Sequence, residues 1–352
     1  MSGATQFEVR RAAIGETRFI AAPSEPGAGE AELRVDIAAL TANTVTYAVH
    51  GQSLRYWDFY PAEHGWGRVP AWGFATVTRS RAPGLAEGER IYGFLTFADR
   101  LTLRLEPSGA TGLSETSTHR AALPGAYNRY RRWSGVADPL VSVLQPLHAT
   151  AYLFDDFLAA NAFFGAEQLI VSSASSKTAL GIAHALGLRA GRPRLIALTS
   201  PGNMAFTDET GAYDRVLPYA ELETIPARPT AYIDLAGDRA LRARVHERFG
   251  EHLTHSAAIG DTHMAEIGPK LAAPTGPRPQ FFFAPAWLKL RQADWGEGGA
   301  AGRLDTAWAT YVDWIRPHLT VRHEQGTDAL TEAWTEAVAG RIPPRDARLL
   351  SL

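Results

Sequence analysis

Apolar and polar positions between residues 168 and 199 come in blocks that predict a strand, a helix and a second strand. Residues 168–173 and 194–199 are short, nearly continuous apolar runs. Between them, residues 179–188 carry apolar side chains at helical spacing. Short apolar runs of this kind are typical of strands buried on both faces, and two such strands joined by a helix make a βαβ unit. The unit is typical of the start of a dinucleotide-binding fold.

Strands and helices continue to alternate after this unit. The pattern predicts a first helix at 149–164, which leads into the unit, and further helices after the unit at 238–249, 304–315 and 328–339; the strands predicted after the unit are 213–217, 230–235, 253–259, 280–284, 319–323 and 347–350. Asp238 is the expected N-cap of the second of these helices. Alternating strands and helices predict a parallel, doubly wound sheet.

The N-terminal part of the chain predicts mostly strands instead. Short alternating runs lie at 7–10, 18–21, 32–37, 71–78 and 89–94. Residues 51–70 form a long loop rich in aromatic side chains. Long loops in compact domains are often functional. An aromatic lid over a core is the alternative interpretation.

Composition narrows the class of protein. The 352 residues carry a net charge of −2 without a basic stripe on any predicted helix, so we expect no nucleic-acid partner. The chain has no cysteine, which excludes disulfides, thiolate nucleophiles and cysteine-ligated zinc. No apolar run approaches the ~18 residues of a membrane span, and the N-terminal residues lack the pattern of a secretory signal. We therefore expect a cytoplasmic protein that does not contact membranes.

Several local motifs, in order along the chain, resemble a known superfamily. They are residues 43–51 (NTVTYAVHG), 69–77 (VPAWGFATV), 88–93 (GERIYG), 145–152 (QPLHATAY) and 340–345 (GRIPPR). Together they resemble the zinc-free quinone and enoyl reductases of the medium-chain dehydrogenase/reductase superfamily. More narrowly, the chain resembles the family catalogued as DUF2855.

The resemblance implies an α/β fold with two domains. A GroES-like β-rich catalytic domain would comprise residues 1–145 and 318–352, and a Rossmann domain with a doubly wound parallel sheet would comprise 146–317. The active site of such proteins lies in the cleft between the two domains. The resemblance also implies a homodimer through the edge of the Rossmann sheet, although residues 281–283 suit an edge or a buried core strand equally well.

The turn after the first Rossmann strand lacks the usual glycines. Its sequence, residues 173–178 (SASSKT), offers hydroxyl groups on Ser173, Ser175, Ser176 and Thr178 and a positive charge on Lys177. A pyrophosphate binds at such a helix N-terminus through backbone N–H groups and the helix dipole. We expect these residues to bind the phosphates of the cofactor, and the alternative is a degenerate fold that has lost its cofactor.

The end of the second Rossmann strand favours NADP(H) over NAD(H). An acidic residue there would bind the ribose hydroxyls of NAD. Here Thr199, Ser200 and Asn203 can donate to a 2′-phosphate, and no carboxylate occurs until Asp208. No basic residue accompanies them at this turn. An ordinary polar turn is the alternative.

No metal site is expected, although histidines recur between 246 and 263. His252 and His255 are three apart on a predicted strand and face opposite sides, so they do not converge on one ion, and His255 is expected to pack in the strand. Gly260 and His263 follow the fifth strand at the edge where open α/β sheets bind ligands. The loop expected after 284 lies at the same edge. We therefore expect Gly260 to contact the cofactor and His263 to line the nicotinamide pocket.

A tyrosine is the expected proton donor for a conjugated carbonyl, enoyl or quinone substrate, because a phenol donates from a hydrogen-bonded position. Tyr47 lies in the motif that resembles the cleft-lining segment, and Tyr56, Tyr60 and His64 compete with it. A buried core tyrosine is the alternative for Tyr47.

Arginines at 129, 131 and 132 form the densest basic cluster. They would anchor an acidic substrate group, since a guanidinium group binds a carboxylate through two parallel hydrogen bonds. The alternative is that they lie in a solvated loop. Asp155 and Asp156 are expected to pair with them.

The leading hypothesis is an NADPH-dependent reductase of a small molecule, working without metal. A non-redox hydrolase or lyase, and a non-catalytic binding protein, remain as alternatives.

Overall fold

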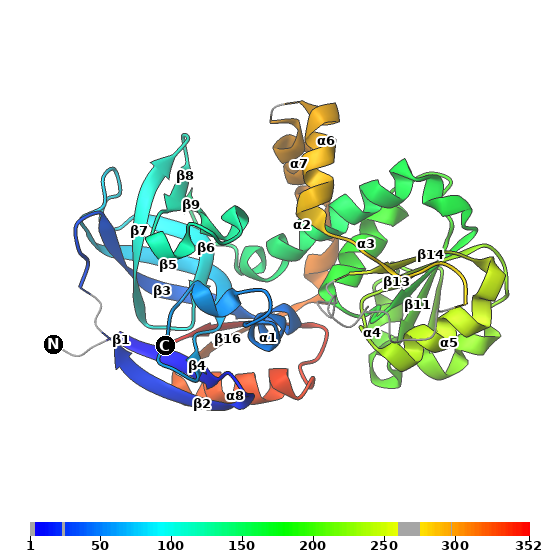
Figure 1. Ribbon diagram of the computed structural model, residues 1–352, viewed down its shortest axis with the longest axis horizontal. Coiled ribbons are helices and arrows are strands. Elements are labelled where there is room, and N and C mark those ends of the chain that lie inside the picture. The colour runs from blue at the N-terminus through cyan, green and yellow to red at the C-terminus, as the bar shows by residue number, and fades with distance from the viewer. Residues whose placement is uncertain (1–3, 23–24, 260–274, 297) are drawn as a thin grey trace. The chain divides into compact units, whose positions relative to one another are not determined.

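The computed structural model describes residues 4–22, 25–259, 275–296 and 298–352. The chain forms two compact units. Unit 1 comprises Met1–Leu144, Thr320–Ile342 and Asp346–Leu352, and unit 2 comprises Gln145–Leu319 and Pro343–Arg345. Figure 1 shows that each unit is built around its own sheet.

The main sheet of unit 1 closes on itself. Its closed part consists, in spatial order, of β3 (Glu30–Leu40), β5 (Pro70–Ser80), β6 (Arg90–Thr96), β9 (Arg129–Trp133), β8 (Gly112–Glu115) and β7 (Arg100–Ser108), and β7 pairs back onto β3. All these pairings are antiparallel. Leu33, Val77 and Leu103 are completely or almost completely buried inside this barrel.

Further elements extend and cover the barrel. β16 (Thr320–Gln325) and β17 (Asp346–Ser351) continue the sheet from β3, and β1 (Ala4–Arg10), β2 (Ala13–Ala22) and β4 (Trp66–Gly67) form a separate antiparallel sheet. The helices are α1 (Ala42–Val49) and α8 (Thr327–Val338), with short 3-10 turns at Tyr56–Asp58, Thr118–Arg120 and Gly125–Asn128. Trp334 of α8 is buried and donates its indole N–H to the carbonyl of Ile14. This bond connects the C-terminal helix α8 to the N-terminal strand β2.

The sheet of unit 2 is parallel throughout. Its spatial order is β12 (Arg215–Pro218), β11 (Arg194–Thr199), β10 (Gln168–Ser172), β13 (Thr230–Asp234), β14 (Leu253–Ala258) and β15 (Gln280–Phe281). Numbered along the chain, this order is 3-2-1-4-5-6, the order of a Rossmann fold. The predicted doubly wound sheet is confirmed, and its strand order reverses between β10 and β13.

Both faces of this sheet are covered by helices (Figure 1). Leu169 and Val171 of β10 pack with α2 (Pro139–Ala160) and α3 (Lys177–Gly187), whereas Ile170 packs with α5 (Arg239–Phe249) on the other face. Burial on both faces explains why the strand reads as a continuous apolar run. The other helices are α4 (Met204–Glu209), α6 (Ala284–Trp295) and α7 (Gly299–Ile315), with 3-10 turns at Ala162–Gly165, Pro201–Asn203, Tyr219–Thr224, Gly250–His252 and Arg316–His318.

Three local predictions were wrong. α2 begins at Pro139, not at 149, and runs through Pro146, because its early residues Leu140 and Leu144 are fully buried and their packing outweighs the proline. It ends at Ala160, since 162–164 adopt positive φ. The loop expected after 284 is the helix α6, and the loop expected at 129–132 is strand β9.

The aromatic segment 51–70 packs into the core of unit 1. Trp57, Phe59 and Tyr60 are all buried. The Trp57 ring lies between two glycines: an added Cβ would come within 2.0 Å of it at Gly51 and 2.4 Å at Gly67. Glycine is therefore required at both positions by close approach. No described helix is long and apolar enough to cross a membrane.

Candidate functional site

The turn between β10 and α3 keeps a sharp conformation without glycine. Ser173 has φ of +51°, a region that residues with a side chain rarely enter. Ser176 then caps α3, because its hydroxyl accepts the N–H of Ala179 at 3.3 Å. Serine thus takes the left-handed conformation at the first turn of this Rossmann fold, and the helix N-terminus follows directly.

Two tyrosines hold this turn. The Ser173 N–H donates to the hydroxyl of Tyr219 at 3.0 Å, and the hydroxyl of Tyr213 donates to the Ala174 carbonyl at 2.8 Å. Both tyrosines flank β12, so contacts across the sheet stabilise the strained residue. Sequence reasoning missed both of them.

Three predicted cofactor residues come together at the ends of β10 and β11. The Ser175 hydroxyl accepts from Thr199 Oγ1 at 3.3 Å and from Asn203 Nδ2 at 3.1 Å. Ser175 and Thr199 are buried, whereas Ser200 and Asn203 are half-buried. Ser200 begins the turn Pro201–Asn203, so its side chain sits where a strand ends and a helix starts.

Lys177 and Arg345 bring positive charge to this region of unit 2. The Lys177 ammonium donates to the carbonyl of Pro344 at 3.0 Å, so it also anchors the segment Pro343–Arg345. Arg345 stacks over Phe206 and pairs with Glu209 at 3.0 Å, both on α4. The sequence predicted no basic residue for the turn after β11, and Arg345 reaches the following helix from far along the chain. Thr178 is half-buried beside Lys177.

A buried carboxylate lies where the strand order reverses. Asp234, at the end of β13, accepts from Ser172 Oγ at 3.0 Å and pairs with Arg242 Nε at 2.7 Å. The Ser172 hydroxyl in turn accepts the N–H groups of Leu235 and Ala236, both at 3.2 Å. This network joins β10 to the loop after β13. Sequence reasoning missed it, although an aspartate closing an apolar run was a visible signal.

In unit 1, α1 positions Tyr47. Thr41 caps the helix through reciprocal bonds with Thr44, which sets its first turn. Asn43 and Tyr47 are four residues apart and share a face, so Asn43 Nδ2 donates to the Tyr47 hydroxyl at 2.7 Å. Trp72 Nε1 on β5 donates to the same oxygen at 3.1 Å. The Tyr47 oxygen therefore accepts two hydrogen bonds, and among the described residues no acceptor takes its own proton.

Tyr47 belongs to an aromatic cluster with Tyr56, Trp72, Phe94 and Tyr127. The Tyr47 and Tyr56 ring centroids are 4.6 Å apart, and the Tyr56 and Tyr127 hydroxyls are 3.1 Å apart. Desolvation raises the pKa of Tyr47 well above its ordinary value, and that of Tyr56 likewise. Both phenols stay protonated at neutral pH, so they can donate a proton but do not act as bases.

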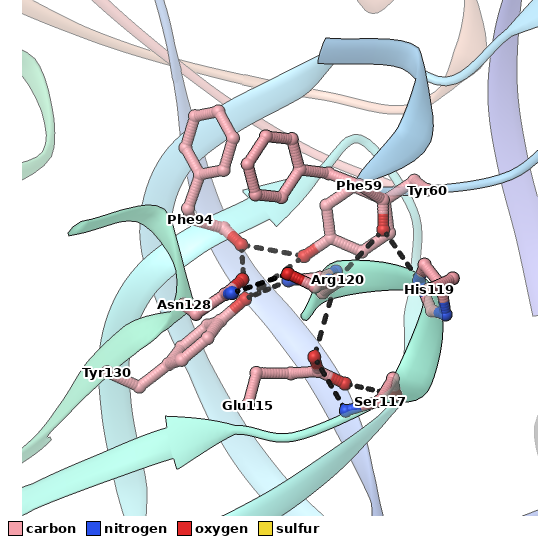
Figure 2. A network of polar contacts seen from close by, with 9 residues as sticks. All are labelled: Phe59, Tyr60, Phe94, Glu115, Ser117, His119, Arg120, Asn128 and Tyr130. Atoms are coloured by element: carbon pink, nitrogen blue, oxygen red, sulfur yellow. Dashed lines mark hydrogen bonds and ion pairs between the residues drawn. The ribbon is translucent and has the colours of Figure 1, made fainter. Parts of the chain in front are cut away.

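A buried ionic network supports this cluster (Figure 2). Arg120 and Glu115 are both buried and form an ion pair at 3.5 Å. Arg120 Nε donates to the carbonyl of Phe59 at 3.0 Å, and its Nη1 donates to the Tyr130 hydroxyl at 3.1 Å. Tyr60 and Tyr130 both donate to the carbonyl of Phe94, each at 2.6 Å. No local sequence pattern indicates that Arg120 is buried, because burial of an arginine is decided by distant partners.

The arginine cluster is not a solvated loop. Arg131 stacks on Trp133 at 4.6 Å, and Arg132 pairs with Glu89 at 2.5 Å. The expected pairing with Asp155 and Asp156 is wrong: Asp155 pairs with Arg189 and Asp156 with Arg291.

The remaining histidine predictions divide in two. His255 is a packed strand residue, with its ring 3.8 Å from that of Phe164 and nearly parallel to it. Gly260 and His263 lie outside the described residues. Within the described ranges, no group of three or more histidine, aspartate or glutamate side chains is arranged to hold a metal ion.

Comparisons with solved structures show the fold. The chain is similar to CurA of Vibrio vulnificus, solved in complex with NADPH, at 12% identity and a TM-score of 0.59, covering 99% of both chains. It is similar to the CurK enoyl reductase at 12% identity and a TM-score of 0.54, again over 99% of both chains. It is also similar to a quinone oxidoreductase of Coxiella burnetii at 12% identity and a TM-score of 0.53, over 99% of both chains. The predicted α/β fold, a GroES-like β-rich domain with a Rossmann domain, is thus confirmed.

The family comparison covers most of the sequence. No curated protein matches the chain significantly. Residues 38–343 match the model described as "Protein of unknown function (DUF2855)". The chain therefore belongs to the DUF2855 family.

Proposed function

We propose that the protein is an NADPH-dependent reductase of a small conjugated carbonyl, enoyl or quinone compound, acting without a metal. The observation that carries the proposal is the strained Ser173, with φ of +51° directly before the N-terminus of α3. Strain of this kind costs of order 1–3 kcal/mol, and residues that carry it cluster at active sites and ligand-binding turns. Similarity to CurA, solved with NADPH, and to enoyl and quinone reductases supports the same conclusion.

The residues of unit 2 fit a dinucleotide. The N-terminus of α3 and the half-buried side chains of Ser176 and Thr178 suit the pyrophosphate. Ser200 and Asn203 suit the adenosine ribose, and Arg345 supplies the charge that a 2′-phosphate prefers. No carboxylate competes in the turn Pro201–Asn203.

When bound, NADPH supplies the hydride. The chain supplies the proton and holds the acceptor. Tyr47 donates its free O–H to the substrate, and the bonds from Asn43 and Trp72 orient its oxygen and stabilise the charge that develops on it. The rings of Tyr56 and Tyr127 offer a flat apolar surface for a conjugated substrate.

The test is a calorimetric titration of wild-type protein with NADPH and NADH, followed by a screen of enones and quinones for nucleotide oxidation. We expect NADPH to bind more tightly than NADH and Arg345→Met to remove most of that preference. Tyr47→Phe should bind NADPH normally and lose at least tenfold in turnover, since general-acid catalysis contributes about 10²–10⁴-fold. Absence of binding by either nucleotide would refute the proposal and favour a non-catalytic protein.

A hydrolase is the second candidate, and the same conformation of Ser173 favours it. Nucleophilic serines of α/β-hydrolases occupy a strained turn between a strand and a helix. Reaction of Ser173 with a fluorophosphonate, abolished in Ser173→Ala, would support this candidate over the reductase.

A further inference from the structure

The outer face of the barrel in unit 1 carries a groove of about 540 Å³, a volume typical of ligand pockets. Four of the lining residues are paired directly across neighbouring strands, namely Arg34 (β3), Thr76 (β5), Arg90 (β6) and Trp133 (β9). Side chains paired in this way share one face of a sheet, with Cβ atoms about 4.5–5.5 Å apart. Arg34 directly follows Leu33, which is buried inside the barrel, so the row faces outward. The sheet therefore places one arginine on each side of a threonine.

Arg34 and Arg90 share a single carboxylate. Arg34 donates to Asp36 Oδ1 through Nε at 3.1 Å and through Nη2 at 3.0 Å, and Arg90 Nε lies 3.5 Å from Asp36 Oδ2. Arg90 Nη1 donates to the carbonyl of Gly135 at 3.5 Å. These contacts leave Arg34 Nη1 and Arg90 Nη2 for a ligand, and the two side chains are 59% and 38% exposed, so a ligand can reach them. Two guanidinium groups beside one carboxylate leave one positive charge to be compensated.

The other charges at the groove are balanced. Arg132 Nη1 pairs with Glu89 Oε2 at 2.5 Å, and Glu89 Oε1 accepts a backbone N–H at 2.6 Å, so both oxygens of this carboxylate are engaged. Arg100, which continues the row on β7, lies 3.8 Å from its own partner, Asp99. The three arginines that line the groove therefore face two carboxylates, which leaves a net charge of +1. An anionic ligand is favoured over a neutral one.

Hydroxyl groups and one aromatic ring complete the lining. Thr111 and Ser134 are both exposed at the groove, so their hydroxyls can donate to a bound anion. A phosphate monoester offers three strong acceptor oxygens and a charge of about −1.5 to −2, whereas a carboxylate offers only two oxygens. Two guanidinium groups and these hydroxyls therefore match a phosphate better. The indole of Trp133 gives the organic part of such a ligand an aromatic surface.

We propose that this groove is a binding site for a small organic phosphate, whose phosphate group accepts from Arg34 Nη1 and Arg90 Nη2 and whose organic part lies on Trp133. The bound anion supplies the negative charge that the shared carboxylate of Asp36 does not. Guanidinium groups bind phosphate through charge-assisted hydrogen bonds, which are the stronger kind. The proposal is independent of the reductase function, because it uses only residues of unit 1 and none that are assigned above to the nucleotide or to proton donation.

The test is calorimetric titration of the full chain with phenyl phosphate, inorganic phosphate, benzoate and phenol, at constant ionic strength because salt screens exposed charges. We expect phenyl phosphate to bind more tightly than inorganic phosphate or benzoate, and phenol not to bind. Arg34→Met and Arg90→Met should each weaken binding of phenyl phosphate at least tenfold, which corresponds to the loss of one hydrogen bond to a charged group. Arg55→Met is the matched control, since Arg55 is also an exposed arginine paired with one carboxylate, and it should bind as wild type does.

A second pair of variants tests the groove without removing an arginine. Ser134→Glu adds a negative charge at an exposed position of the groove and should abolish binding, whereas Ser53→Glu adds the same charge at an exposed position elsewhere in unit 1 and should not. A thermal melt of each variant checks that it is folded. Phenyl phosphate binding that survives both arginine variants, equal weakening by Arg55→Met, tighter binding of benzoate, or no binding of phenyl phosphate would each overturn the proposal.

Discussion

Removal of the buried charge of Arg120 is the sharpest test of how unit 1 is held together. Arg120 is 1% exposed, and the Glu115 side chain with which it pairs is equally buried. Arg120→Met leaves the Glu115 carboxylate without a cation, and it leaves the Phe59 carbonyl with only the longer contact from His119 Nε2 at 3.4 Å. Breaking a buried pair in this way costs about 3–5 kcal/mol. That is a large part of a typical folding free energy of about 5–15 kcal/mol.

The measurement is urea unfolding followed by tryptophan fluorescence. The matched control is Arg55→Met, which removes an exposed ion pair to Asp58 and should cost less than about 1 kcal/mol. The double variant Arg120→Met/Glu115→Leu removes both charges and should be more stable than Arg120→Met alone. A loss below 1 kcal/mol for Arg120→Met, or a double variant no more stable than Arg120→Met, would refute the reasoning.

Three further predictions concern stability. Burial lowers the pKa of His255 from 6.5 to about 4, so the imidazole stays neutral in the folded protein. The free energy of unfolding therefore has its full value above pH 6.5 and falls by about 3 kcal/mol as the pH drops towards 4, because the unfolded chain takes up the proton first. Urea unfolding across this window should show the loss, and His255→Phe should flatten it; an unchanged slope would contradict the assignment. Ser173→Gly should change unfolding free energy by less than about 1 kcal/mol because glycine adopts its φ freely, whereas Ser173→Val should lose about 1–3 kcal/mol; equal stability of the two would disprove the strain. Gly51→Ala should lower the melting temperature through a loss of about 1–3 kcal/mol, since its Cβ would collide with Trp57, and Gly15→Ala, with nothing within 4 Å, should not; similar shifts would contradict the packing.

Parts of the candidate site could be predicted because they follow strand ends. Ser175, Thr199 and Asn203 lie after two neighbouring parallel strands, and the carboxyl ends of such strands share one edge of a sheet. Adjacency in the sheet therefore made their contact foreseeable. Tyr47 was predicted from a local motif, and its role stays a prediction.

Other residues could not be predicted, because their partners lie far away in sequence. Arg345 meets Glu209 across 136 positions, and Lys177 meets Pro344 across 167. Asp155 pairs with Arg189 and Asp156 with Arg291, and not with the arginines at 129–132, since ion pairing depends on distance in space. Contacts between residues so far apart along the chain leave no pattern in the local sequence from which they could be predicted.

The sequence by itself determined the parallel sheet of unit 2 and the mainly β character of unit 1. Periodicity reports which faces are buried, and β10 is apolar throughout because α2 and α3 cover one face and α5 the other. Only the tertiary structure decided that Ser173 takes the left-handed conformation, that Trp57 lies between two glycines and that Arg120 is buried. The physical reason is that strain and desolvation are tolerated where distant groups compensate for them, as Tyr219 does for Ser173 and Glu115 for Arg120.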